Sequence, residues 1–255
     1  MDVARYPILE FDSDRPAVIE PSQVLEPIDI AELCVLCFFG DVVADMARRD
    51  DTRLVHECGS EMGAHPIYEL TIDGSRVAFA QPGIGAPLSA AILEELIALG
   101  CRKLVVCGGA GVLDGRLAMG SPVLVTSAVR DEGTSYHYLP PDAEARPALR
   151  VQTAIADALR RQEWEYVEGK TWTTDGVYRE TRSRVRRRAA SGCITVEMEA
   201  AALFAVAEFR GAELGQVLYA GDDVGGEQWD NRGWQDARSV RERLFWVAVD
   251  ACLRL

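Results

Sequence analysis

Short apolar runs of strand length alternate along the chain with longer stretches in which apolar residues recur at helical spacing. This alternation constrains the fold strongly, because strands connected through helices build layered α/β domains. The expected strands are residues 33–39, 66–72, 76–80, 104–107, 121–127, 166–173, 193–196 and 212–220. The expected helices are residues 42–49, 87–99, 147–162, 182–190, 199–209 and 237–253. We therefore predict an α/β protein.

The composition is that of one large domain. The chain has 255 residues, of which 48% are apolar, so it can fill one sizeable core. Residues 1–30 are rich in Pro, Asp and Glu, and we expect them to form an extended N-terminal arm on a domain of residues 31–255. No apolar run approaches a membrane span, and the start does not have the pattern of a signal peptide. We therefore predict a cytoplasmic protein that does not bind membranes.

The charge and the cysteines exclude several kinds of ligand. A net charge of −13 would repel the phosphates of a nucleic acid, but it is compatible with a small, locally recognised ligand. The seven cysteines are expected to be reduced thiols. Cys34 and Cys37 lie three apart on an expected strand and so face opposite sides. The three histidines do not have ligand spacing with the cysteines, and we predict no bound metal.

The stretch from Val196 to Phe204 places two carboxylates and a thioether at the start of an alanine-rich run. Glu197 and Glu199 fall where an expected strand passes into a buried helix that Gly211 would end. Burying a carboxylate costs several kcal/mol unless something binds it, which favours a ligand site. The alternative is that these charges only complement the helix dipole.

Five motifs occur together in the order and spacing of a known superfamily. They are PGIGAP at 82–87, GGAG at 108–111, GTSYHY at 133–138, TDGVY at 174–178 and EMEAAA at 197–202. Over about residues 33–220 the chain resembles the nucleoside phosphorylases of the purine and uridine phosphorylase type, a superfamily that includes nucleosidases using water. The resemblance implies a mixed central sheet flanked by helices and an enzyme that cleaves the N-glycosidic bond of a nucleoside. It also implies no cofactor and a homo-oligomer built from dimers.

The same resemblance suggests how the sugar is held. Glu199 would bind the ribose hydroxyls, and its charge would favour the positive charge that develops at C1′. Met198 would pack on the sugar and Glu197 would line the same wall, although Met198 can equally be ordinary core packing. Gly40 lies at the family's first glycine turn.

The base pocket departs from the family pattern. A phenylalanine that often stacks on the base is replaced by Val177, before Tyr178, so Trp229 and Trp234 are candidates for stacking, or else loop anchors. His137 matches a recurrent family position, but we expect a structural role for it.

The leaving base needs a proton, and Asp222 matches the aspartate with which purine-specific members protonate N7. It follows an expected buried strand, where ligands collect in α/β sheets. An acid that donates near neutral pH must be kept protonated by burial or by a neighbouring carboxylate, and Asp223 is a candidate neighbour. The alternative is an Asp-rich surface turn. Because pyrimidine-specific members do not use this aspartate, a purine-type base is favoured.

The choice between water and phosphate as nucleophile depends on the cations of the site, because a phosphorylase must hold phosphate with fixed cations. The family's phosphate-binding arginines align with Ala44, Val106 and about Gly63, and its phosphate-binding Ser or Thr aligns with Gly109. Nucleosidases also lack the arginines and position water with an acidic residue of the first helix. Asp45, or alternatively Asp41, occupies that place. We therefore favour water over phosphate as the acceptor.

Three alternatives stay open at this point. The enzyme can be a phosphate-dependent phosphorylase, or the chain can be a nucleoside-binding protein that has lost catalysis. The arginine-rich run 182–188 can bind a 5′-phosphate, which would make the substrate a nucleotide. Such runs are more often solvated faces or subunit contacts.

Overall fold

A computed structural model describes residues 6–255. The strands are β1 Leu33–Cys37, β2 Thr52–Ser60, β3 Gly63–Ile72, β4 Ser75–Ala80, β5 Lys103–Val112, β6 Pro122–Asp131, β7 Val167–Thr174, β8 Cys193–Glu197 and β9 Glu213–Asp223. The α-helices are α1 Pro21–Val24, α2 Gly40–Met46, α3 Ala86–Leu99, α4 Leu149–Arg161, α5 Arg182–Ala190, α6 Ala200–Arg210 and α7 Arg238–Cys252. Short 3-10 helices are η2 Pro7–Leu9, η3 Thr134–His137, η4 Val177–Arg179 and η5 Trp234–Asp236.

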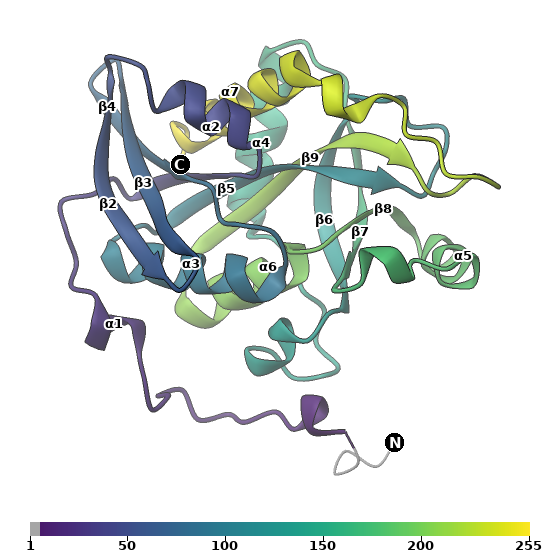
Figure 1. The fold of residues 1–255 in the computed structure, drawn as a ribbon, viewed down its shortest axis with the longest axis horizontal. Helices are drawn as coiled ribbons and strands as arrows, with labels where there is room; N and C mark the ends of the chain where they lie inside the picture. The colour runs from purple at the N-terminus through teal and green to yellow at the C-terminus, as the bar shows by residue number, and fades with distance from the viewer. Residues whose placement is uncertain (1–5) are drawn as a thin grey trace.

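The strands form one nine-stranded mixed sheet in the order β2-β3-β4-β1-β5-β8-β7-β6-β9. A further pairing of β5 with β9 closes the second half of this sheet into a ring (Figure 1). The strands β1, β4, β5 and β9 run parallel, whereas β2–β3, β5–β8 and β6–β9 pair antiparallel. The predicted α/β fold with a mixed central sheet is confirmed.

Helices cover both faces of the sheet, and β1 shows why. Cys34 and Leu36 pack in the core under α3 and α6, whereas Val35 and Cys37 pack under α2, α4 and α7. Because successive side chains of a strand point to opposite faces, a strand that is apolar at every position must be buried on both sides. Figure 1 shows these two helical layers above and below the sheet.

Most predicted elements lie within a few residues of the observed ones, with three differences. The strand β2 was not predicted, because most of its side chains are exposed or half-buried and it has no continuous apolar run. The strand β5 extends through the 108–111 glycines, beyond the expected strand of residues 104–107, since Gly109 pairs with Tyr219 and Gly111 with Val196. Likewise, β9 extends to Asp223, so Asp222 lies in a strand and not in a surface turn.

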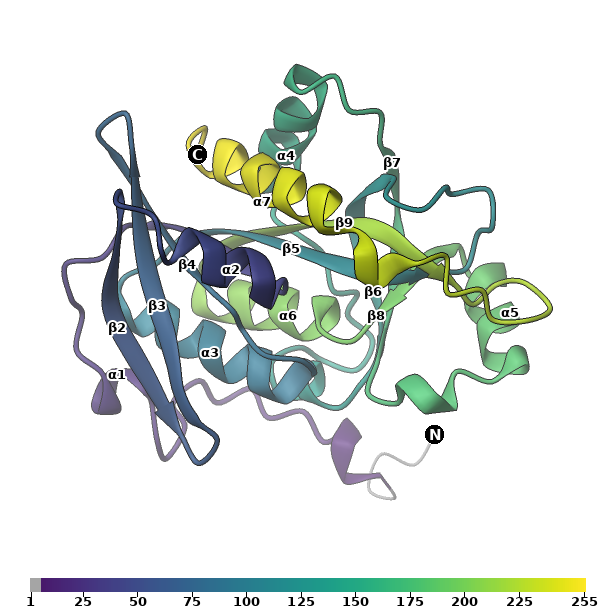
Figure 2. The same cartoon turned by 45° about the horizontal axis from the view of Figure 1, so that its top comes forward.

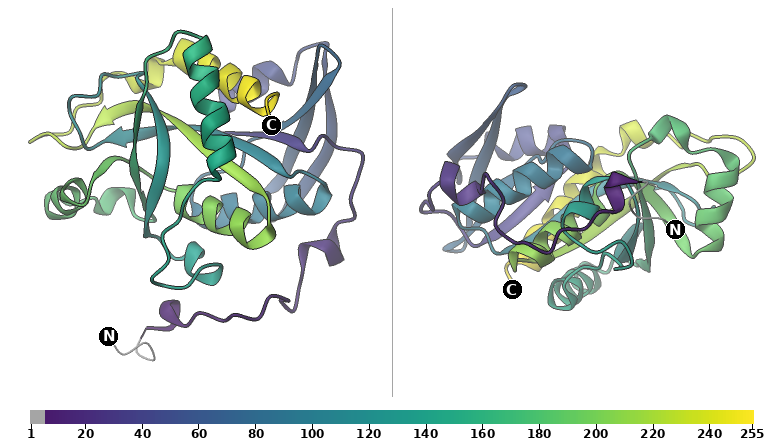
Figure 3. Two further views of the ribbon diagram at one scale, coloured as in Figure 1. Left: turned by 180° about the vertical axis from the view of Figure 1, so that it is seen from behind. Right: turned by 90° about the horizontal axis from the view of Figure 1, so that it is seen from below.

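The chain before β1 lies along the α3 and α6 side of the domain (Figures 1 and 3). Apart from η2 and α1, residues 6–32 have no helix or strand. Arg15 donates a hydrogen bond to the Phe209 carbonyl at 2.9 Å, and its guanidinium stacks on the Phe209 ring. Residues 1–5 of the expected arm lie outside the described residues. No helix within residues 6–255 combines the length and apolar composition needed to cross a bilayer.

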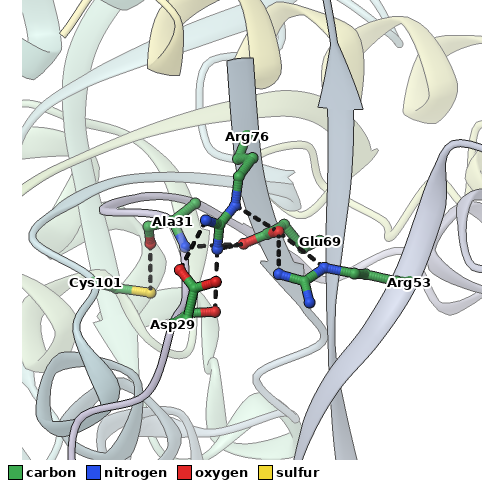
Figure 4. Close-up of polar contacts among 6 residues, drawn as sticks. All are labelled: Asp29, Ala31, Arg53, Glu69, Arg76 and Cys101. Carbon is green, nitrogen blue, oxygen red and sulfur yellow. Dashed lines mark hydrogen bonds and ion pairs between the residues drawn. The ribbon is translucent and has the colours of Figure 1, made fainter. Parts of the chain in front are cut away.

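A buried carboxylate ties the end of this segment to the strands β2, β3 and β4 (Figure 4). Glu69 of β3 is 1% exposed. It accepts hydrogen bonds from Arg53 of β2 at 2.8 Å, from Arg76 of β4 at 2.7 Å and from the Ala31 N–H at 2.9 Å. Burial alone would raise the pKa of Glu69, but the hydrogen bonds from the two arginines outweigh it and lower the pKa.

Candidate active site

A cavity of about 420 Å³ lies beside the carboxyl ends of β1, β5, β8 and β9. Strands β5 and β9 run side by side in the same direction (Figure 1), and residues near their carboxyl ends line the cavity. Ligands of open α/β sheets bind at such strand ends. Most of the predicted site residues line the cavity, namely Gly40, Asp41, Gly109, Val177, Glu197, Met198, Glu199 and Asp222.

Glu197 is bound by the protein on both of its oxygens. Its Oε1 accepts a hydrogen bond from the Thr173 hydroxyl at 2.6 Å, and its Oε2 accepts from the N–H groups of Glu199 and Ala200 at 2.8 and 2.6 Å. It thus binds N–H groups at the start of α6, as the helix-dipole alternative described. Burial raises the pKa of Glu197 above its ordinary value. We infer that its main contribution is to fix the wall of the cavity.

Glu199 has fewer protein partners. Its Oε1 accepts from the Gly85 N–H at 2.6 Å, and its Oε2 has one longer contact, with the Met198 N–H at 3.3 Å. Gly85 has φ +93°, a backbone conformation that favours glycine. Burial, and then the charge of Glu197, raise the pKa of Glu199. A ligand that donates hydroxyl groups would therefore stabilise the ionised carboxylate.

Asp222 has one oxygen bound by the protein. Its Oδ2 accepts a hydrogen bond from the indole Nε1–H of Trp229 at 2.6 Å. Asp223 is not the carboxylate neighbour that we expected, because it forms an ion pair with Arg232 at 2.5 Å and accepts from the Gly225 N–H at 2.8 Å. Instead, Glu180 interacts with Asp222: burial, and then the Asp222 charge, raise the pKa of Glu180 to about 7.

A third group of polar side chains lies around Asp41. Arg241 of α7 donates to the Asp41 carboxylate at 3.3 Å and to the Trp234 carbonyl at 2.9 Å, and it lies against the Tyr219 hydroxyl. Tyr219 also explains the glycine at 109, because a Cβ there would stand 2.9 Å from the tyrosine ring. Tyr219 thus occupies the space into which a side chain at position 109 would extend.

Three predicted site residues lie outside the cavity formed by the described chain. The carboxylate of Asp45 is bound by Arg48 and Arg238, away from the cavity lining. Tyr178 is 96% exposed, and His137 is exposed on η3. None of the three lines the cavity formed by residues 6–255.

The arginine-rich run mainly docks α5 onto the domain. Arg184 and Arg188 both bind Asp131, at 2.6 and 2.8 Å, and Arg182 binds the carbonyls of Val224 and Gly226. These three guanidinium groups are therefore engaged by the protein itself, and the 5′-phosphate alternative has no support from them.

Sequence reasoning missed several residues of the site. Arg241 and Tyr219 had no recognisable motif, because each reaches the cavity only through the packing of α7 and β9 against β5. Gln216 was also missed. It lines the cavity, is 1% exposed, and its Oε1 has no partner among the described residues, so it can accept a hydrogen bond from a ligand or from water. No cluster of metal-binding side chains occurs within residues 6–255.

Comparison with known proteins identifies the family of this chain. Residues 32–252 match the model of the phosphorylase superfamily. Guanosine phosphorylase from Halorubrum lacusprofundi is 27% identical over 247 residues, covering 92% of this chain and 99% of that protein. Uridine phosphorylase from Treponema pallidum is 29% identical over 196 residues, covering 72% of this chain and 75% of that protein.

Two solved structures share the fold at lower identity. Uridine phosphorylase from Vibrio fischeri has a TM-score of 0.74 and 22% identity, covering 95% of this chain and 96% of that one. AMP nucleosidase from Bacteroides thetaiotaomicron has a TM-score of 0.70 and 23% identity, covering 89% of this chain and 90% of that one.

Proposed function

The chain belongs to the phosphorylase superfamily and is an enzyme that cleaves N-glycosidic bonds, and we propose that it hydrolyses purine-type nucleosides. One observation carries this proposal: a single cavity contains Glu199, Asp222 and Asp41. N-glycosidic cleavage needs a group that holds the sugar, an acid for the leaving base and a group that directs the nucleophile. These three carboxyl groups have the chemistry for those three roles.

The preference for a purine is supported by Asp222. A purine leaves more easily when its N7 is protonated, and Asp222 is a carboxyl group in the cavity with one oxygen bound by an N–H donor. The carboxyl group of Glu180, whose pKa is raised to about 7 by burial and by the Asp222 charge, interacts with it. A pyrimidine has no N7 to accept that proton.

The charge of the cavity supports water as the acceptor. Its lining contains four carboxyl groups, and among the described residues Arg241 is the one cation there. Arg241 is already paired with Asp41. Phosphate is a dianion that needs uncompensated cations, and the described lining offers none. Water needs only an acceptor for its proton, and Asp41 supplies one.

In the proposed reaction, each proton that moves has a named donor and a named acceptor. The C1′–N9 bond breaks as Asp222 gives its proton to N7, and the charge of Glu199 stabilises the positive charge at C1′. Water attacks C1′ and gives a proton to Asp41, whose carboxylate is oriented by Arg241. The products are the free base and ribose.

The first experiment measures base release from purine and pyrimidine nucleosides by chromatography, with the protein dialysed free of phosphate. We expect purine nucleosides to be cleaved at full rate in the absence of phosphate, with ribose as the second product. Cleavage that requires phosphate and yields ribose 1-phosphate would overturn the water proposal. Cleavage of pyrimidine nucleosides alone would overturn the role of Asp222.

A matched pair of variants tests the acceptor role of Asp41. Asp41→Asn should lower kcat about 100-fold or more, because the amide does not take a proton from water. Asp45→Asn is the control, because the Asp45 carboxylate lies outside the cavity. The kcat of this variant should stay within about twofold of the wild-type value. Equal loss in both variants would show that the acidic character of α2 matters only for structure.

The phosphorylase reaction is the second candidate, and two observations favour it. The side chain of Arg241 lines the cavity and is only 14% exposed. The relatives described above include two phosphorylases that this chain matches over 99% and 75% of their own length. If phosphate is required, Arg241→Met should raise the KM for phosphate more than the KM for the nucleoside.

A further inference from the structure

The two oxygens of the Asp222 carboxyl group have different surroundings. Oδ2 accepts the hydrogen bond from the Trp229 indole at 2.6 Å. Oδ1 is on the side of Gly111, which lines the cavity, and a Cβ built on Gly111 would stand 3.7 Å from it. No protein donor contacts Oδ1 within residues 6–255. The indole therefore occupies one oxygen and leaves the other to the cavity.

The loop that carries Trp229 is fixed at its base. Asp223 and Asp230 exchange two backbone hydrogen bonds, at 2.8 and 3.0 Å, which close residues 224–229 into a short loop. Arg232 binds the Leu117 carbonyl at 2.8 Å as well as Asp223. On the other side, Arg182 of α5 binds the carbonyls of Val224 and Gly226. The loop projects beyond β9 next to α5, as Figure 2 shows.

The packing around the indole does not explain its position. Trp229 is 60% exposed, although an indole is largely apolar. Its one polar group points to Asp222, and burial of the ring contributes little. Two arginines and a backbone bridge hold this loop in place. The tryptophan that it carries is exposed, and its polar contact is with one carboxylate oxygen of Asp222.

We propose that Trp229 is a positioning residue that places the catalytic proton on Oδ1 of Asp222. A protonated carboxyl group has one O–H and one carbonyl oxygen. The oxygen that accepts the indole N–H is the carbonyl oxygen, because an O–H directed at that donor would repel it. The proton is then carried by Oδ1, on the cavity side. This inference rests on the proposed role of Asp222 as the acid for a purine.

Trp229 also acts in the step itself. As the Oδ1–H bond breaks and the N7–H bond forms, the C1′–N9 electron pair passes into the purine and Asp222 becomes a carboxylate. The indole N–H then donates to a charged acceptor, and such hydrogen bonds are stronger than those to a neutral one. Its contribution is therefore larger in the transition state than in the ground state, which raises kcat and leaves KM nearly unchanged.

The test compares substrates that need the proton with substrates that do not. Inosine needs N7 protonation, whereas 7-methylguanosine already carries a positive charge on its imidazole ring, and 4-nitrophenyl riboside has a leaving group that departs as an anion. Trp229→Phe keeps an aromatic ring and removes the N–H. We expect kcat on inosine to fall about tenfold, with KM within about twofold. On both acid-independent substrates, the ratio of variant to wild-type kcat should stay within about twofold.

A purely structural role would give a different result. If Trp229→Phe lowers turnover of all three substrates equally, the residue only supports the fold of the loop, and the inference is overturned. An unchanged rate on inosine would overturn it as well. Trp164→Phe is the matched control, because Trp164 packs against Arg243 and does not line the cavity. It should match the wild type on every substrate.

A second variant separates this inference from the proposed function. Asp222→Asn should lower kcat on inosine by about 100-fold or more and spare the acid-independent substrates. If Asp222→Asn does not affect inosine, the proposed role of Asp222 fails, and the inference fails with it. If Asp222→Asn behaves as expected but Trp229→Phe does not, only the role of Trp229 is lost.

Discussion

Glu197 and Glu199 are two residues apart and have different roles in the structure. Glu197 is bound on both oxygens by the hydroxyl of Thr173 and by backbone N–H groups at the start of α6. Glu199 is buried beside this carboxylate with two backbone contacts, at 2.6 and 3.3 Å. An acid whose folded-state pKa is raised destabilises the fold as it ionises. Ionised Glu199 therefore costs stability, which is the cost that the role we propose for it in the reaction would offset.

Glu199→Gln should separate these two effects. We expect kcat/KM to fall about 100-fold or more, because the amide lacks the charge that stabilises the developing cation. The wild type should lose stability relative to this variant as the pH rises above about 4.3, since only the wild type has to ionise a buried group whose pKa is raised. Steady-state kinetics and urea unfolding between pH 5 and pH 9 measure both.

Glu208→Gln is the control for Glu199→Gln, because Glu208 lies on the exposed side of α6. It should change neither the activity nor the pH dependence of stability. Retained activity in a folded Glu199→Gln protein would remove Glu199 from the reaction.

At the scale of elements, one charge cluster links the strands β2, β3 and β4 in addition to their backbone pairing. Glu69 is buried, but Arg53 and Arg76, which bind it, are partly exposed, at 56% and 36%. Removing one partner of a buried ion pair costs about 3–5 kcal/mol, and the exposure of the arginines reduces this cost. The cluster lies in the half of the sheet that does not close into the ring.

Glu69→Gln should lower the free energy of unfolding by about 2 kcal/mol at pH 7. The folded-state pKa of Glu69 is depressed, so its contribution is present above the unfolded value of about 4.3 and is lost as the pH falls through the folded value. The difference from the wild type should therefore shrink in acid. Urea unfolding at pH 7 and pH 3.5 measures it.

The control for Glu69→Gln is Glu57→Gln on β2, because the Glu57 side chain is exposed. The free energy of unfolding of Glu57→Gln should stay within about 0.5 kcal/mol of the wild-type value. A difference for Glu69→Gln that persists unchanged in acid would contradict the assigned pKa direction.

At the scale of the whole molecule, Arg210 is one of the residues that connect the N-terminal segment to the domain. Arg210 at the end of α6 binds Glu20 at 2.7 Å and Glu94 of α3 at 2.6 Å. The segment itself exposes apolar side chains, among them Val18 at 97%. Its position along α3 and α6, visible in Figure 3, therefore depends on a few polar and stacking contacts and not on a core of its own.

Arg210→Met should loosen this segment and also destabilise the domain. Amide exchange over residues 16–25 should become about tenfold faster, because the ion pair to Glu20 is lost. The free energy of unfolding should fall by about 1–2 kcal/mol, since Glu94 is left buried without its cation. Hydrogen exchange with mass spectrometry and urea unfolding measure the two effects.

Glu20→Gln is the matched variant for Arg210→Met, because it removes the contact to the segment and keeps the contact to Glu94. It should speed exchange in residues 16–25 with little change in global stability. Identical global losses in the two variants would contradict this division.

The sequence by itself determined the fold class, the order of the elements and the positions of Glu199 and Asp222. Apolar runs and helical periodicity are local patterns, and short motifs such as EMEAAA keep their residues together whatever the rest of the chain does. Because these patterns are local, they did not predict the strand β2 or the full length of β5. The strand β2 is exposed and has no such pattern, and the glycines 108–111 became a strand only because β8 and β9 supply hydrogen-bond partners.

Only the tertiary structure decided which side chains meet at the cavity. Arg241 pairs with Asp41 across 200 residues of sequence, and Gly85 binds Glu199 across 114. Asp222 and Asp223 are adjacent, yet one binds Trp229 and the other Arg232, because successive side chains of a strand point to opposite faces. Contacts of this kind depend on how helices and strands pack, and a local pattern of residues carries no information about a partner that far along the chain.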